Sequence, residues 1–140
     1  VGPPRMRVLN AEIRMKLAHI ALWTPRLEEA AQFWRDHFDA EIGPRYESRN
    51  RPGFASRFAT LPGTDLRIEL MEGPWVGPHP GEVSGWAHIA LAVGSAVEVD
   101  RIAERFAEKG LLVSTSRRTG DGYYEAVVRA PDGTLIEIVE

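Results

Sequence analysis

Four ionisable side chains occur in two copies of one pattern and have the chemistry of metal ligands. They are His19, Glu69, His88 and Glu137. Both histidines are the second letter of the pentapeptide AHIAL, and the glutamate follows after 50 residues in the first copy and 49 in the second. Imidazole and carboxylate groups bind Ni²⁺, Co²⁺, Zn²⁺, Fe²⁺ or Mn²⁺ without selecting one of them. Two neutral imidazoles and two carboxylates around one divalent cation form a site without net charge.

Strand alternation predicts that these four side chains share one face. Side chains along a strand point alternately to two faces, so each histidine in AHIAL opposes isoleucine and leucine. Glu69 in RIELM and Glu137 in LIEIV oppose aliphatic residues in the same way. Helices pack on the aliphatic face, so the polar set is expected on the concave face of a curved sheet.

Two simpler interpretations compete for each residue taken alone. The glutamates are also explained as outward positions of half-exposed strands, and the histidines as hydrogen-bonded core residues. Their register across the repeat favours a shared role, because four buried and unpaired charges would each cost several kcal/mol.

The elements that position these residues also occur twice. LEEAAQFWRDHF (27–38) has the spacing of an amphipathic helix, and Thr24 and Pro25 favour its start. The second helix follows a capping box formed by Ser95 and Glu98. Further strands are predicted at 42–49, 56–61, 66–72, 112–117, 123–129 and 134–139. Each half therefore has the order β-α-β-β-β.

The predicted fold class is α+β, with two tandem βαβββ modules forming a cupped mixed sheet and helices on its outer face. The first module spans 16–72 and the second 86–140, joined by a linker rich in proline and glycine at 73–85. Residues 1–15 are expected to be an N-terminal tail, and Met15 is a candidate for the true start.

Composition excludes several classes of function. The 140 residues are 44% hydrophobic with a net charge of −3, which argues against a nucleic-acid or membrane partner. No apolar run has the length of a membrane span, and the first residues lack the apolar segment of a signal peptide. The absence of cysteine excludes a disulfide framework and a thiol nucleophile. A cytoplasmic location is expected.

With these motifs the sequence resembles the vicinal oxygen chelate superfamily over residues 16–140. This superfamily includes glyoxalase I, extradiol dioxygenases, methylmalonyl-CoA epimerase, and fosfomycin- and bleomycin-resistance proteins. The resemblance implies paired βαβββ modules around a metal, and the four ligand candidates match the His/Glu/His/Glu set of glyoxalase I. PDGTLIEIVE is similar to the family's terminal motif.

Two positions depart from the glyoxalase I pattern. Trp23 stands where bacterial glyoxalase I usually has an arginine that helps bind glutathione. Gly73 stands where that family has an asparagine. Both departures disfavour a glutathione hemithioacetal as the substrate.

The function implied is that of a glyoxalase I-like lyase or isomerase with one divalent metal ion (Ni, Zn, Co, Mn or Fe). Four protein ligands on an octahedral ion leave two positions, which a small substrate with adjacent oxygens can occupy. The metal acts as a Lewis acid that stabilises an enediolate, and Glu69 or Glu137 is the expected catalytic base.

Three alternatives stay open at this point. A non-haem Fe²⁺ dioxygenase uses two histidines and one carboxylate, which the second glutamate disfavours. A fosfomycin-type thiol transferase has a similar set of ligands, two histidines and one glutamate, without the second acid. A bleomycin-type resistance protein binds a drug without metal.

Roles are also predicted for residues outside the four ligand candidates. Substrate contacts are expected from Trp23, Arg67, Tyr123 and Tyr124, whereas His37 is expected to be solvated and His79 to lie in the linker. A C2 homodimer is predicted, with Trp75, Trp86 and the linker at the interface.

Overall fold

The computed structural model describes residues 15–140, and the predicted tail other than Met15 lies outside the described residues. The first module contains β1 (Ile20–Trp23), α2 (Leu27–Phe38), β2 (Glu41–Ile42), β3 (Tyr46–Glu47), β4 (Ala55–Thr60) and β5 (Arg67–Glu72). The second contains β6 (Ile89–Ala92), α3 (Ala96–Glu108), β7 (Leu112–Arg118), β8 (Tyr124–Arg129) and β9 (Leu135–Val139). No helix in the described part of the chain is long and apolar enough to cross a membrane.

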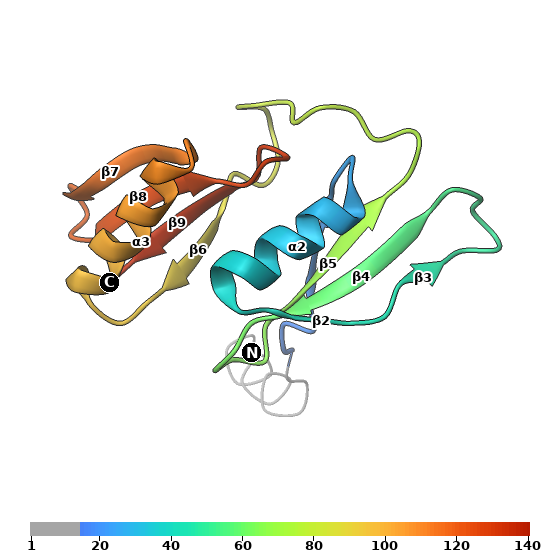
Figure 1. The fold of residues 1–140 in the computed structure, drawn as a ribbon, viewed down its shortest axis with the longest axis horizontal. Coiled ribbons are helices and arrows are strands. Elements are labelled where there is room, and N and C mark those ends of the chain that lie inside the picture. The colour runs from blue at the N-terminus through green and yellow to red at the C-terminus, as the bar shows by residue number, and fades with distance from the viewer. Residues whose placement is uncertain (1–14) are drawn as a thin grey trace, which may run out of the picture.

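The two modules have the same strand order. The first sheet runs β1-β5-β4-β2, with β3 also paired to β4, and the second runs β6-β9-β8-β7. In each, the first strand pairs in parallel with the last, and the other pairs are antiparallel. The modules lie side by side as two sheets that are not joined by strand pairing (Figure 1). The predicted α+β class with two βαβββ modules is confirmed.

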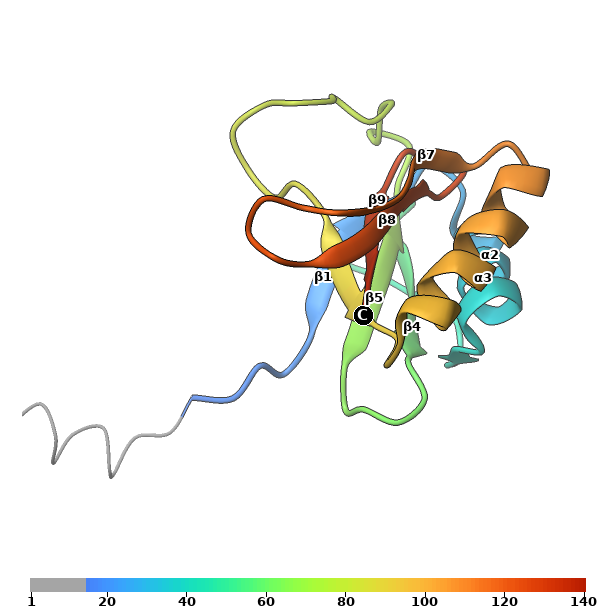
Figure 2. The same cartoon turned by 90° about the vertical axis from the view of Figure 1, so that its left-hand side faces the viewer.

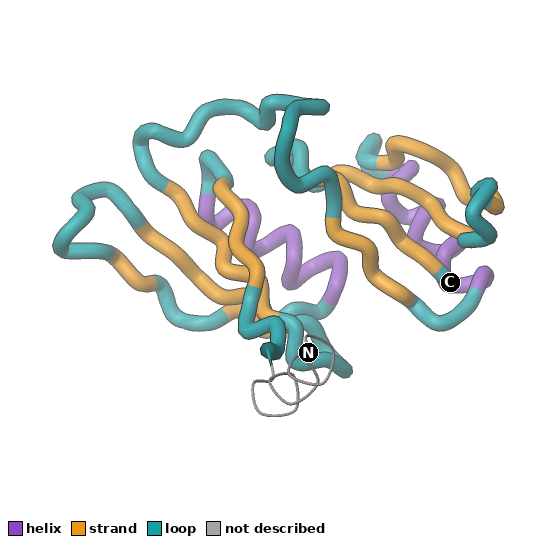
Figure 3. Tube along the Cα trace, turned by 180° about the vertical axis from the view of Figure 1, so that it is seen from behind, coloured by secondary structure: helices purple, strands orange, loops and turns teal. Residues whose placement is uncertain are grey.

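Both helices cover the same side of the molecule, and the other side exposes both sheets (Figures 2 and 3). The apolar stripe of α2 buries Leu27 and Trp34 against Ile68 and Leu70 of β5. A fully buried aliphatic side chain of this kind contributes about 1.5–3 kcal/mol. The corresponding core of the second module is formed by Val99, Ile102, Phe106, Val128, Ile136 and Ile138.

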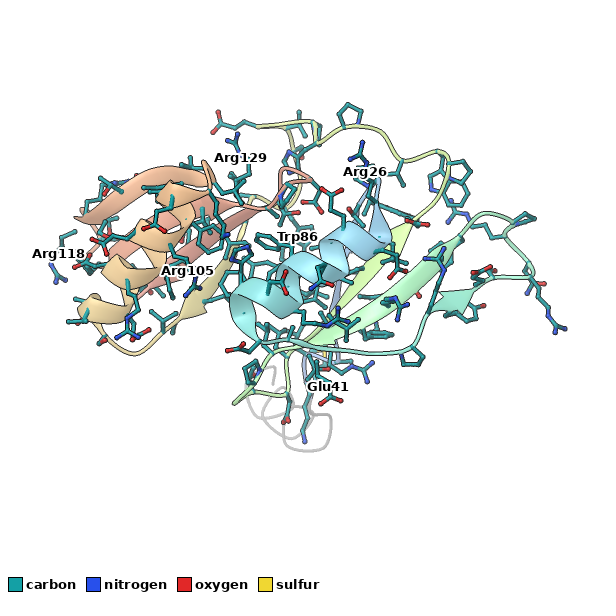
Figure 4. All side chains as sticks on the ribbon, viewed as in Figure 1. Arg26, Glu41, Trp86, Arg105, Arg118 and Arg129 are labelled. Carbon is teal, nitrogen blue, oxygen red and sulfur yellow. The ribbon has the colours of Figure 1, made fainter. Side chains whose placement is uncertain are left out.

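The modules contact each other through the two helices. The ring of Phe106 on α3 lies 4.8 Å from the ring of His37 and 6.0 Å from that of Phe33, both on α2. Arg105 of α3 reaches toward α2, and its Nη2 donates to the His37 carbonyl at 3.0 Å (Figure 4). The expectation that His37 is solvated is therefore wrong. Desolvation by burial lowers the pKa of His37, and the positive charges of Arg105 and Lys109 lower it further.

The strand predicted at 42–49 is interrupted. Gly43 and Pro44 separate β2 from β3, because proline has no N–H to donate to a ladder. The Gly43 N–H donates to the Phe58 carbonyl at 2.8 Å, which keeps the interrupted strand attached to β4.

The start of α2 also differs from the prediction. The helix begins at Leu27, and the side chain of its N-cap residue Arg26 accepts no capping hydrogen bond. The Thr24 hydroxyl accepts only from the Arg26 N–H, at 3.4 Å, ahead of the first helical residue. Instead the Leu27 N–H donates to Oε1 of Glu72, at the end of β5, over 2.6 Å. Glu72 thus satisfies a free N–H at the helix start and ties α2 to the sheet. The second helix begins as predicted, with Ser95 Oγ accepting from the Glu98 N–H at 3.2 Å.

Candidate metal site

The structure forms two equivalent histidine–glutamate pairs, one in each module. His19 Nε2 lies 3.4 Å from Glu69 Oε1, and His88 Nε2 lies 3.2 Å from Glu137 Oε1. Both histidine side chains are 38% exposed, and the glutamates are 20% and 22% exposed. The near identity of these values shows that the repeat has reproduced the environment of the pair as well as its residues.

Strand register explains how each pair forms. Ala21 of β1 pairs with Glu69 of β5, and Ala90 of β6 pairs with Glu137 of β9. The residues flanking each glutamate, which are Ile68, Leu70, Ile136 and Ile138, are fully buried beneath the helices. Alternation then directs both glutamates to the opposite, open side of each sheet, toward the histidine that precedes the adjacent strand.

The spacing within each pair suits two ligands of one cation. Ligands bound at about 2.1 Å lie about 3.0 Å apart at an octahedral ion and about 3.4 Å apart at a tetrahedral one. The observed separations of 3.4 and 3.2 Å fall in this interval. The donor set of imidazole nitrogen and carboxylate oxygen also suits a divalent transition metal.

The structure does not bring all four residues together within one chain. Among residues 15–140, no three histidine, aspartate or glutamate side chains are grouped closely enough to hold a metal ion. His19 and His88 do line the same cleft, which has a volume of about 580 Å³ and runs along β1 and β6. Each chain therefore carries two separate pairs, called half-sites below, each with two of the four ligand candidates.

The first half-site has an aromatic and a cationic neighbour. The ring of Phe58 on β4 meets the His19 ring edge-on at 5.2 Å. The guanidinium of Arg67 lies 4.2 Å above the Phe58 ring and has no ion pair among the described residues. Arg67 shares the open side of the sheet with Glu69, where it can meet an anionic group of a substrate.

The second half-site contains a carboxylate that the sequence interpretation missed. Glu125 on β8 is only 8% exposed. Desolvation by burial raises the pKa of Glu125, and the nearby charge of Glu137 raises it further. Alternation along YEAVVR could have indicated its face, but its proximity to Glu137 depends on the register of β8 with β9. The equivalent position in the first module is Ser56, from the register of β4 with β5.

The other predicted substrate residues lie in different environments. Trp23, at the end of β1, is 43% exposed and meets the rings of Phe54 and Trp75 edge-on, each at 6.0 Å. Tyr123 is 55% exposed in the turn before β8. Tyr124 points to the helix side, where its hydroxyl donates to Asp100 Oδ1 of α3 at 2.7 Å.

Two βαβββ modules, each with a histidine and a glutamate on the open side of its sheet, define a two-module α+β class of fold. Residues 16–138 match the model of the Glyoxalase/Bleomycin resistance protein/Dioxygenase superfamily. The chain belongs to this superfamily. No curated protein matches the sequence significantly.

Solved structures share the fold at low sequence identity. The chain resembles a glyoxylase/bleomycin resistance protein/dioxygenase domain from Frankia sp. EAN1pec with a TM-score of 0.76 and 19% identity, covering 91% of this chain and 92% of that one. It also resembles the fosfomycin resistance protein FosX from Listeria monocytogenes, with a TM-score of 0.70 and 22% identity, covering 91% of this chain and 94% of that one. The match to glyoxalase I from Zea mays has a TM-score of 0.70 and 18% identity, and it covers 87% of this chain but only 43% of the maize chain. At these identities the likeness shows the fold alone.

Proposed function

We propose that the protein is a divalent-metal-dependent, glyoxalase I-like lyase or isomerase that transfers a proton on a small substrate with two adjacent oxygens. The observation that carries the proposal is the pair of equivalent half-sites, His19–Glu69 and His88–Glu137, each at a ligand-to-ligand spacing. Superfamily membership supports the proposal, because its members commonly use a divalent metal. A cytoplasmic location and the identity of the metal stay predictions.

A homodimer would complete the site. Because one chain holds two separated half-sites, a two-fold axis that sets the first pair of one protomer against the second pair of its partner would make two four-ligand sites. Apolar side chains near both histidines are available for this contact: Leu17 is 72% exposed and Trp86 is 95% exposed. Trp86 lies between the two modules (Figure 4), and burial of these side chains would favour association.

The roles of the residues follow from their positions. When bound, a divalent cation supplies Lewis-acid stabilisation of negative charge that develops on substrate oxygens. His19 and His88 would hold it through Nε2. Glu69 or Glu137 would accept the proton beside the substrate carbonyl through a carboxylate oxygen, a contribution of about 10²–10⁴-fold in rate. Arg67 would orient an anionic end of the substrate.

Metal content tests the proposal directly. Purified protein reconstituted with Ni²⁺, Zn²⁺, Co²⁺, Mn²⁺ or Fe²⁺ is expected to retain about one ion per chain and to melt at a higher temperature. His88→Ala should lose the ion, whereas Glu104→Ala, which removes an exposed carboxylate from α3, should retain it. Protein that binds none of these ions and shows no rise in melting temperature would refute a metal enzyme and favour drug sequestration.

A further inference from the structure

An aromatic cluster lies on the first module beyond the His19–Glu69 pair. Trp23 of β1 is its centre, with Phe54 and the linker residue Trp75 each 6.0 Å away and edge-on. Trp75 comes from the linker that runs from β5 to β6 (Figure 1). The Trp23 and Trp75 side chains are each 43% exposed, so part of each ring is free to contact a ligand.

The Trp75 indole is held from two directions. A Cβ atom on Gly73 would lie 2.3 Å from the Trp75 ring, so the indole rests directly against the glycine backbone. The guanidinium of Arg51 lies 4.0 Å from the Trp75 ring centroid and 5.6 Å from that of Trp23. In the described part of the chain Arg51 has no carboxylate partner, which leaves its guanidinium free to stack. The indole surface is therefore formed before any ligand arrives.

The two indoles form one side of a pocket of about 300 Å³. Its other walls are mainly apolar and are provided by Pro25, Val76, Pro78 and Pro80. The imidazole of His79 also lines the pocket, and its Nδ1 accepts a hydrogen bond from the Gly81 N–H at 3.1 Å. The single carboxylate at the pocket, that of Asp132, already accepts a hydrogen bond from the Thr134 N–H at 3.0 Å. A volume at the lower end of the range for ligand pockets, with mainly apolar walls, fits one uncharged planar ring.

This pocket adjoins the cleft that both histidines line. Trp23 and Pro80 belong to the walls of both cavities. Trp23 follows His19 by four residues on the same face of β1, a distance of about 13 Å along the strand. A molecule with its reactive oxygens beside His19 can therefore place a ring against Trp23.

We propose that the Trp23–Trp75 pocket binds an uncharged aromatic ring, so that the substrate carries adjacent oxygens at one end and such a ring at the other. The identification of the bound molecule as the substrate rests on the proposed function, whereas the binding of the ring does not. Because the two indoles are edge-on to each other, a ring that packs face-on against Trp23 meets the edge of Trp75. Both contacts favour an aromatic ring over an aliphatic group of the same apolar area.

Binding of benzyl alcohol to metal-free protein tests this inference, with cyclohexylmethanol as the aliphatic probe of similar size. Saturation-transfer NMR is expected to detect benzyl alcohol more strongly than cyclohexylmethanol. Trp75→Leu and Trp23→Leu, which keep apolar volume but remove a ring, should weaken benzyl alcohol binding about three- to tenfold. Val97→Ala, which removes a 67% exposed side chain from α3, should leave it unchanged. Circular dichroism confirms that each variant is folded.

Equal binding of the two probes, or folded leucine variants that bind benzyl alcohol as tightly as the wild type, would overturn the inference. Because these measurements use metal-free protein, failure of the metal proposal leaves them valid. With metal bound, the ratio of kcat/KM for a phenylglyoxal–thiol adduct to that for a methylglyoxal–thiol adduct should fall about three- to tenfold in Trp75→Leu. An unchanged ratio would exclude the pocket from substrate binding even if the enzyme is active.

Discussion

Mixing two inactive variants would test whether each metal site is built from two chains. His19→Ala damages the first half-site, and His88→Ala damages the second, and each homodimer is expected to lack both metal sites. If each site is shared between two chains, one site in a heterodimer of the two variants receives both damaged half-sites. The other receives the intact His88–Glu137 pair of one protomer and the intact His19–Glu69 pair of its partner.

The recovery can be calculated from this geometry. Random exchange between equal amounts of two homodimers makes about half of the dimers heterodimeric, and each heterodimer has one intact site of its two. Metal content and turnover should therefore rise from near zero to about one quarter of the wild-type values. If all four ligands came from one chain, no combination of these variants would contain an intact site, and mixing would restore nothing.

The chain offers a matched control in a second mixture. His19→Ala and Glu69→Ala both damage the first half-site, so every site in their heterodimer contains one damaged pair. This mixture should stay near zero whichever way the subunits exchange. Native mass spectrometry would verify heterodimer formation, and inductively coupled plasma mass spectrometry would measure bound metal. Verified heterodimers of the first mixture that bind no more metal than their parents would refute the shared site.

Three further predictions follow from single contacts. Gly73→Ala places a methyl group against the Trp75 indole and should cost about 1–3 kcal/mol of stability or displace the ring, measured by urea denaturation and tryptophan fluorescence. Glu72→Ala and Ser95→Ala, which each remove the acceptor at the start of one helix, should each destabilise the fold by about 1 kcal/mol, and equal denaturation midpoints with the wild type would contradict this. Burial lowers the pKa of His37 below that of the unfolded chain, so the unfolded state binds more protons below about pH 6.5. Stability should therefore be complete above that pH and fall below it, and His37→Gln should reduce this dependence of the urea midpoint on pH.

Local patterns were sufficient to predict the architecture. The two helices and the five-element βαβββ modules follow from periodicity and from a repeat of nearly constant length. The break at Gly43 and Pro44 and the capping of Leu27 were not predictable in this way. The cap is a contact between residues 45 positions apart, and it depends on where β5 ends relative to α2.

The pairing of a histidine with a glutamate in each half-site was predictable, as the fold was, from local sequence patterns. Strand alternation placed His19 and Glu69 on one face of the sheet, and the repeat placed His88 and Glu137 in the same way. Glu125 was missed because its neighbour, Glu137, is reached only through the register of two strands. Trp75 was missed as a partner of Trp23 because the linker has no periodicity from which a contact can be inferred.

The repeat determines the ligands, but differences between the modules would determine how a substrate lies on them. Three positions around the first pair carry large or charged side chains where the equivalent positions around the second carry small or aliphatic ones, whereas Glu125 beside the second pair replaces Ser56. By strand register the contrasts are Trp23 with Ala92, Phe58 with Val127, and Arg67 with Leu135. In a site assembled from one pair of each kind, the ring and any anionic group of the substrate would therefore be directed toward the first module. A nearly symmetric set of four ligands would then still hold an asymmetric molecule in one orientation, which a stereospecific proton transfer requires.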